Sequence, residues 1–131
     1  MACSLLGIKQ TEELNLTIFK GHLFEGLIIS DFYKQFYNMG QQPPLYFWRD
    51  RNGLVEIDCI FEKAGRLTPI EIKSGKTFDS SFFDGLKKWN VIAETEAANN
   101  YLVYGGELTQ LRQNGNLVGW QQSATLMNKL S

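Results

Sequence analysis

The 131-residue sequence predicts a single α/β domain with the order helix, three meandering strands, helix, strand. Three observations predict it: a helical stripe of large apolar side chains in residues 21–37, alternating strands with tight turns over 45–73, and a second helical stripe after residue 80. With 44% hydrophobic residues, a chain of this length can bury one core. No internal repeat or linker divides it, so we expect one domain over residues 1–131.

The first predicted helix covers residues 21–37. Gly40 follows its last apolar position and two prolines come soon afterwards, which predicts that the helix ends near Asn38. A separate short helix is expected within residues 5–14. The predicted apolar stripe, spaced i, i+3, i+4 and i+8, consists of Phe24, Leu27, Ile28, Phe32 and Phe36.

Three short strands are expected next, at residues 45–49, 54–62 and 67–73. Asn52-Gly53 suits the first tight turn, and residues 63–66 form the second. In the middle strand the residues alternate, which predicts one apolar face and one face that presents acids. The apolar set is Val55, Ile57, Cys59 and Phe61, and the opposite set is Glu56, Asp58 and Ile60.

The second helix should start at a cap formed by Ser80 or Ser81 and continue to about Ala98. Its predicted buried stripe consists of Phe82, Leu86, Trp89 and Ala93. A buried strand at 101–104 is ended by two glycines, and Asn114-Gly115 indicates an extra C-terminal hairpin. Residues 121–131 are expected to form a short terminal helix or a tail.

Charge and cysteine usage narrow the class of protein. A formal net charge of −1 removes the simplest argument for a nucleic-acid binder, so any basic patch must be local. Cys3 and Cys59 form no metal-ligand or disulfide pattern. Residues 1–6 lack the basic start of a secretory signal, and the apolar segment 23–29 is too short to cross a bilayer. We therefore expect a cytoplasmic protein without a membrane partner.

Asp58, Glu71 and Lys73 are the strongest candidates for residues of a functional site. Side chains two positions apart on a strand point to the same face, so Glu71 and Lys73 should emerge together. The short turn between their strands makes them antiparallel neighbours, which can bring Asp58 beside Glu71 across 13 positions of sequence. The sequence therefore predicts that two carboxylates and an ammonium group converge.

Such a cluster suits a divalent cation. Adjacent carboxylates repel each other, and a hard dication such as Mg²⁺ offsets that repulsion through oxygen ligands. The bound cation can polarise a phosphoryl oxygen and activate an attacking water. Lys73 would orient that water or stabilise charge in the transition state. A solvated salt-bridge cluster is the open alternative.

Several strings in the sequence resemble a known family. Asp58 followed by Glu71-Ile72-Lys73 matches the PD-(D/E)xK motif of the restriction-endonuclease-like superfamily. Over residues 4–104 the chain also resembles the C-terminal DUF4143 region of prokaryotic AAA-type ATPases. The strings that carry this resemblance are Gly21-His22-Leu23-Phe24-Glu25, Leu45-Tyr46-Phe47-Trp48-Arg49, Val55-Glu56-Ile57-Asp58 and Pro69-Ile70-Glu71-Ile72-Lys73-Ser74.

The resemblance implies an αβββαβ core with a mixed central sheet flanked by helices. It also implies a metal-dependent nuclease that acts on nucleic acid, with DNA as the expected substrate, in which Asp58 and Glu71 hold Mg²⁺ or Mn²⁺. Lys73 would serve catalysis and Glu25 would assist from the first helix. Ile57 stands where the motif commonly has proline. No GxxxxGK[ST] phosphate loop is present, so this chain cannot hydrolyse ATP alone.

Two further readings stay open. The domain can be a non-catalytic DNA-binding or protein-interaction module that derives from an AAA-type ATPase, with the ATPase as partner. It can also be a homo-oligomer that associates through the C-terminal hairpin, if Leu117, Val118 and Trp120 are exposed there.

Overall fold

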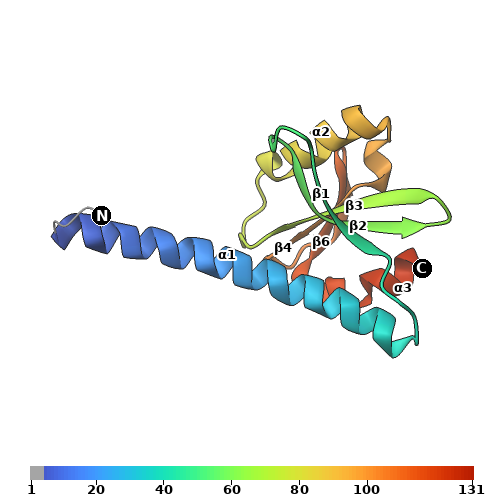
Figure 1. Ribbon diagram of the computed structural model, residues 1–131, viewed down its shortest axis with the longest axis horizontal. Coiled ribbons are helices and arrows are strands. Elements are labelled where there is room, and N and C mark those ends of the chain that lie inside the picture. Colours follow the sequence, from blue (N-terminus) through green and yellow to red (C-terminus); the bar gives the residue numbers. More distant parts are fainter. Residues whose placement is uncertain (1–4) are drawn as a thin grey trace.

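The computed structural model describes the backbone of residues 5–131 and the side chains from residue 16 onward. A six-stranded mixed sheet forms its centre, with helices on both faces (Figure 1). The strand order is β1-β2-β3-β4-β6-β5. The strands are β1 Leu45–Arg49, β2 Glu56–Lys63, β3 Arg66–Lys73, β4 Tyr101–Tyr104, β5 Gln110–Arg112 and β6 Gly115–Gly119. The helices are α1 Leu5–Asn38, α2 Asp84–Ala93 and α3 Leu126–Leu130, with 3₁₀ turns η1 Ser80–Phe83, η2 Ala97–Asn99 and η3 Trp120–Thr125.

Helix α1 is one continuous helix of 34 residues, so the prediction of a separate short helix at 5–14 is wrong. No proline interrupts residues 5–38, and isolated glycines cost a helix only about 1 kcal/mol each. The predicted end is confirmed. Gly40, at φ +70°, donates its N–H to the Tyr37 carbonyl and Gln41 donates to the Phe36 carbonyl, both at 3.0 Å. This pair of bonds is the Schellman arrangement.

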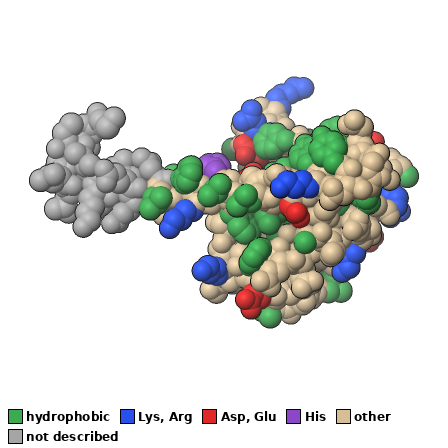
Figure 2. All heavy atoms as spheres, turned by 90° about the horizontal axis from the view of Figure 1, so that it is seen from below, with side chains coloured by type: hydrophobic (Ala, Val, Ile, Leu, Met, Phe, Trp, Pro, Cys, Tyr) green, Lys and Arg blue, Asp and Glu red, His purple; other side chains and the backbone are tan. Residues whose placement is uncertain are grey.

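Only one side of α1 packs on the sheet. Ile28, Phe32 and Phe36 are buried, but Leu27 is 61% exposed, so its predicted place in the core is wrong. The i, i+4, i+8 row alone faces the sheet, and Leu27 lies beside that row. Farther toward the N-terminus α1 extends beyond the body of the domain, and apolar side chains gather along it (Figure 2). None of the helices described over residues 5–131 has the length and apolar character of a membrane span.

The first three strands form the predicted meander. β1 pairs antiparallel with β2, and β2 pairs antiparallel with β3. The turn between β2 and β3 holds two residues at positive φ, Ala64 at 53° and Gly65 at 78°, which is the geometry that matches the twist of a two-residue hairpin. β4 then lies parallel to β3, with α2 in the crossover between them.

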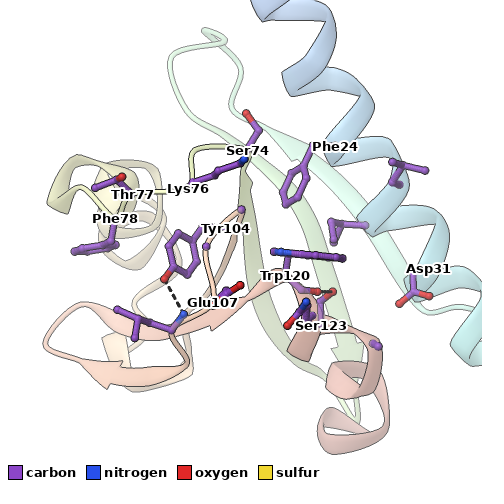
Figure 3. A pocket seen from close by; sticks show the side chains of 17 residues that line it. Phe24, Asp31, Ser74, Lys76, Thr77, Phe78, Tyr104, Glu107, Trp120 and Ser123 are labelled. Atoms are coloured by element: carbon purple, nitrogen blue, oxygen red, sulfur yellow. Dashed lines mark hydrogen bonds between the residues drawn. The ribbon is translucent and has the colours of Figure 1, made fainter.

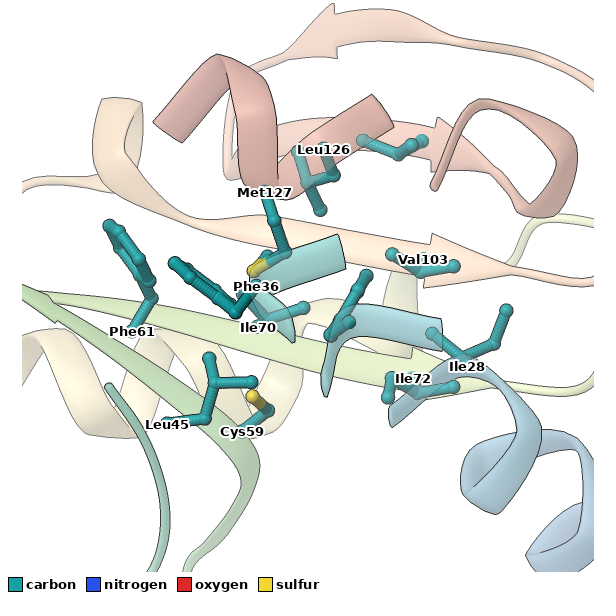
Figure 4. Close-up of a cluster of buried hydrophobic side chains, with 12 residues drawn as sticks. Ile28, Phe36, Leu45, Cys59, Phe61, Ile70, Ile72, Val103, Leu126 and Met127 are labelled. Atoms are coloured by element: carbon teal, nitrogen blue, oxygen red, sulfur yellow. The ribbon is translucent and has the colours of Figure 1, made fainter. Parts of the chain in front are cut away.

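A β-bulge in β2 overturns the predicted alternation. Tyr46 of β1 pairs with Ile60 and Trp48 pairs with Ile57, so three steps along β2 correspond to two along β1. Ile57 and Ile60 therefore both face α2, whereas Cys59 packs on the opposite side. The sheet is buried on both faces and has no single acid-bearing face. Figure 4 shows the core on the side of α1 and α3.

Helix α2 begins and ends differently from the prediction. Ser80 and Ser81 lie in the preceding turn η1, which Asp79 caps by accepting the Ser81 N–H at 2.8 Å, and α2 itself starts at Asp84 after Phe83 without a side-chain cap. The helix ends at Ala93 because Glu94 adopts a left-handed conformation at φ 55°. Leu86 and Trp89 are buried as expected, while Phe83, rather than Phe82, fills the core.

The C-terminal hairpin belongs to the central sheet. β5 pairs antiparallel with β6, and β6 pairs parallel with β4. Leu117 and Val118 are consequently buried, so the alternative of an exposed interface formed by these two residues is wrong, and of the three only Trp120 retains substantial exposure. The expected terminal helix is present as η3 and α3. Buried Gln35 of α1 anchors both, because it donates to the Ser123 carbonyl and accepts the Met127 N–H.

Asn100 is a buried polar anchor that the sequence analysis did not identify. Its side chain is fully buried and exchanges two hydrogen bonds with the Asn90 amide, at 2.9 and 2.7 Å. It donates a third to the Asn114 carbonyl at 2.9 Å. Asn100 thus joins the end of α2, the start of β4 and the β5–β6 turn.

We predict that Asn100→Ala lowers the free energy of unfolding by about 3 kcal/mol, because it removes three hydrogen bonds and leaves the half-buried partners Asn90 and Asn114 without them. Urea denaturation of Asn100→Ala against the exposed control Gln113→Ala measures the difference. Equal midpoints for the two variants would contradict this role.

Candidate active site

Asp58 and Glu71 meet where the backbone ladder between β2 and β3 stops. The last ladder pair at this end is Cys59 with Ile70. Beyond it the Asp58 N–H donates to Glu71 Oε1 at 3.1 Å, and the Ile72 N–H donates to Asp58 Oδ2 at 2.9 Å. Each carboxylate therefore takes the place of a backbone acceptor. The two side chains lie side by side, as the sequence analysis expected.

Lys73 completes the predicted convergence on the α2 side of the sheet. Its Nζ lies 3.8 Å from Glu71 Oε2, and its side chain is 42% exposed whereas that of Glu71 is 7% exposed. Glu71 is enclosed by the first turn of α2. A Cβ placed on Gly85 would lie 3.3 Å from Glu71 Oε2, so a larger residue would press on the carboxylate.

Glu25 reaches the same place from α1. It is half-buried, and burial is the main reason that its pKa is raised. The negative charge of Asp58 and a side-chain hydrogen bond with it act in the same direction, while His22 and Lys73 oppose them. The structure therefore brings together all four residues singled out from the sequence.

The surroundings of Glu71 raise its proton affinity. Burial, followed by the charge of Asp58, raises the pKa of Glu71 to about 8, against an ordinary value of 4.5. The Asp58 N–H and Lys73 act against this rise without cancelling it. Burial, followed by the charge of Asp58, also raises the pKa of the Cys59 thiol to about 12, so this buried cysteine is no nucleophile.

The pair of carboxylates fits a water-rich divalent cation. Within the described residues there is no group of three or more His, Cys, Asp or Glu arranged to hold a metal ion. Mg²⁺, however, commonly binds through one or two carboxylates and keeps several waters. Asp58 and Glu71 each have one oxygen outside the two backbone hydrogen bonds. These oxygens are the ligands that such a site would use.

A large hollow of about 1010 Å³ is lined by sequence neighbours of this cluster, although none of its four residues lines it (Figure 3). Phe24, which precedes Glu25, and Ser74, which follows Lys73, both line it. Trp120 contributes an exposed aromatic face, and Lys76 adds a cation. The hollow lies among α1, the loops that follow β3 and β4, and η3. No pattern in the sequence predicts this hollow, and Trp120 was expected only to contribute to the hairpin.

Glycines hold the loop after β3 in place beside the hollow. The Gly105 N–H donates to the Gly75 carbonyl at 3.0 Å, and a Cβ on Gly106 would lie only 2.6 Å from the Lys76 carbonyl. A side chain at Gly105 would collide with the Ser74 carbonyl. Gly105-Gly106 was predicted only to end a strand, but this glycine pair is also the sequence signal for the close approach of the two loops.

The raised pKa of Glu71 predicts a stability that depends on pH. Between its ordinary value of 4.5 and about 8, the folded state retains a proton that the unfolded state releases, so stability falls as pH rises through this window. Thermal denaturation without divalent cations should therefore give a lower Tm near pH 8 than near pH 5. Glu71→Gln should reduce this slope. Glu25 acts in the same direction, so some slope should remain.

Comparison with known proteins supports one assignment. No curated protein and no solved structure matches the chain. A family model described as a domain of unknown function, DUF4143, matches residues 20–122. The match continues past residue 104 through β5 and β6, so the hairpin expected to be an extra piece lies within the family domain. Because the model covers most of the sequence, this chain belongs to the DUF4143 family.

Proposed function

We propose that this domain is a metal-dependent nuclease of the PD-(D/E)xK type, which hydrolyses phosphodiester bonds in nucleic acid, with DNA as the expected substrate. The observation that carries the proposal is the pairing of two carboxylates at the end of the ladder, with Lys73 beside them: Glu71 accepts the Asp58 N–H, and Asp58 accepts the Ile72 N–H. The order helix, three strands, helix, strand supports it, since it is the order expected for a restriction-endonuclease-like core.

In this proposal Asp58 and Glu71 hold Mg²⁺ or Mn²⁺. When bound, the cation would polarise a phosphoryl oxygen and lower the pKa of a coordinated water. Glu71 would release its proton on loading, because an ionised carboxylate is the better oxygen ligand. The enclosure of Glu71 under α2 fixes the position of its carboxylate, which favours a preorganised site.

Lys73 and Glu25 have complementary roles. The ammonium of Lys73, partly open to solvent, can donate to a non-bridging phosphate oxygen and stabilise the charge that develops as water attacks phosphorus. Glu25 has a raised proton affinity and lies near Asp58, so it can take the proton that the attacking water loses. The bond from phosphorus to the leaving oxygen then breaks, and that oxygen acquires a proton from solvent.

In this proposal the substrate would lie in the hollow that Phe24 and Ser74, the sequence neighbours of Glu25 and Lys73, line. A duplex would require a broad basic surface, which a near-neutral chain does not readily supply. Phe24 and Trp120 instead offer apolar and aromatic surface suited to an unpaired base. The proposal therefore favours single-stranded or frayed ends over intact duplex.

One observation favours the alternative, a non-catalytic module that binds another protein. Leu16, Phe19 and Leu23 on the projecting part of α1 are each about half exposed or more. Such a stripe is typical of a helix that packs against a partner, and an ATPase is the partner that the family resemblance implies. In that case the acid cluster would be structural and would not require a cation.

We predict that the protein cleaves single-stranded DNA in Mg²⁺ or Mn²⁺, and that Asp58→Ala and Lys73→Ala each lower the rate by about 100-fold or more. Both substitutions remove charge that acts on the reacting phosphate. Glu56→Ala is the matched control, because Glu56 lies on the same strand but pairs with Arg49 at the surface. Equal rates in all four proteins would refute the assignment.

Metal binding provides a separate test. Calorimetry should show Mn²⁺ binding that weakens at least about tenfold in Asp58→Ala and becomes tighter between about pH 6 and pH 8, because Glu71 must lose its proton. Glu56→Ala should bind like the unaltered protein. Absence of binding by the unaltered protein at millimolar Mn²⁺ would favour the non-catalytic alternative.

A further inference from the structure

We propose that a second hollow, between the β2–β3 hairpin and α3, binds an anion that carries a phosphate monoester or a diphosphate. This site is independent of the nuclease proposal. The hollow has a volume of about 410 Å³. Both elements lie at the same side of the molecule, where the hairpin tip and the C-terminal helix approach each other (Figure 1).

Three cations surround the hollow. Lys63 and Arg66 come from the hairpin, and Lys129 comes from α3, more than 60 positions later in the sequence. No acidic residue is among those that line it. Within the described part of the chain, none of the three cations forms an ion pair within 4.0 Å. In a chain with 14 acidic and 13 basic residues, this local excess of positive charge is not a consequence of composition.

The hairpin carries a local electrostatic cost. Lys63 and Arg66 are direct cross-strand partners at the last pair before the turn. Like charges directly opposite each other destabilise an antiparallel pair, and Lys129 adds a third positive charge nearby. An anion in the hollow would convert this repulsion into three attractions.

The backbone holds the cations on fixed supports. The turn residues Ala64 and Gly65 both adopt positive φ, which closes a tight hairpin and sets Lys63 against Arg66. Helix α3 is fixed by the Met127 N–H, which donates to buried Gln35 at 3.1 Å. The site therefore needs little rearrangement to accept a ligand, which favours affinity.

Phosphate is the chemistry that fits this group best. The guanidinium of Arg66 can donate two parallel hydrogen bonds to phosphate oxygens, and the lysines add point charges. Thr68, Asn99 and Tyr101 add polar side chains around the same hollow. A triply positive, small site matches two or more negative charges on one ligand. A terminal phosphate or a diphosphate has them, whereas an internal phosphodiester has one.

This site lies apart from the acid cluster. Arg66 and Lys73 are seven positions apart on β3, a span of about 23 Å along a strand. Thr68 belongs to the alternation that includes Ile70 and Ile72, which pack toward α1, whereas Glu71 faces α2. Failure of one site therefore leaves the other intact.

Calorimetry with pyrophosphate tests the inference on the full chain at low ionic strength. We expect measurable binding that weakens with added salt and falls at least tenfold in both Arg66→Gln and Lys129→Ala. Lys88→Ala, which removes an exposed lysine of α2 away from the hollow, should bind like the unaltered protein. Tm values of the variants without ligand show that each one folds.

A second measurement detects the repulsion itself. Lys63→Gln should raise the Tm in the absence of anion, and pyrophosphate should raise the Tm of the unaltered protein more than that of Lys63→Gln.

Comparing 5′-phosphorylated with 5′-hydroxyl oligonucleotides identifies the source of the phosphate: a preference for the former indicates a nucleic-acid end, and equal binding indicates a small free ligand. Either result supports the site. No pyrophosphate binding, or equal binding in Arg66→Gln, Lys129→Ala and Lys88→Ala, would overturn it.

Discussion

The candidate site depends on two hydrogen bonds between β2 and β3 in which a carboxylate, rather than a backbone carbonyl, accepts a backbone N–H. Next to the bulge in β2, Asp58 receives the Ile72 N–H and gives its own N–H to Glu71. This exchange satisfies two backbone donors that the ladder no longer pairs, so the strands can separate without an unsatisfied group. The same bonds hold the two acids together. Backbone geometry and candidate chemistry thus have one origin.

The arrangement leaves the buried carboxylate of Glu71 beside a second carboxylate, that of Asp58, with little positive charge nearby. Glu71 is nearly inaccessible, and its ionic partner Lys73 lies at 3.8 Å and is partly solvated. A proton relieves the imbalance at neutral pH, which the pKa of about 8 expresses. A divalent cation relieves it differently, by allowing both acids to ionise. A proton and a divalent cation would therefore compete for this site, so binding of the proposed metal would depend on pH.

The sequence predicted most of what depends on local chemistry. Gly40 ended α1, tight turns produced the meander, and same-strand spacing placed Glu71 with Lys73. The bulge could not be predicted, because the sequence through Ile57 and Cys59 alternates as a regular strand would and only pairing with β1 reveals the extra residue. Asn100 was missed for a similar reason. Its partners come from α2 and the β5–β6 turn, and no local pattern joins them.

Strand β3 connects two concentrations of like charge. Acids gather at its carboxyl end, and cations gather around the hairpin at its start. In a nearly neutral chain these groups could have neutralised one another, yet the fold keeps them at opposite ends of one strand. Each cluster destabilises the fold unless something of opposite charge binds there. The two proposed ligands, a divalent cation at one end and a phosphate-bearing anion at the other, would each supply that opposite charge.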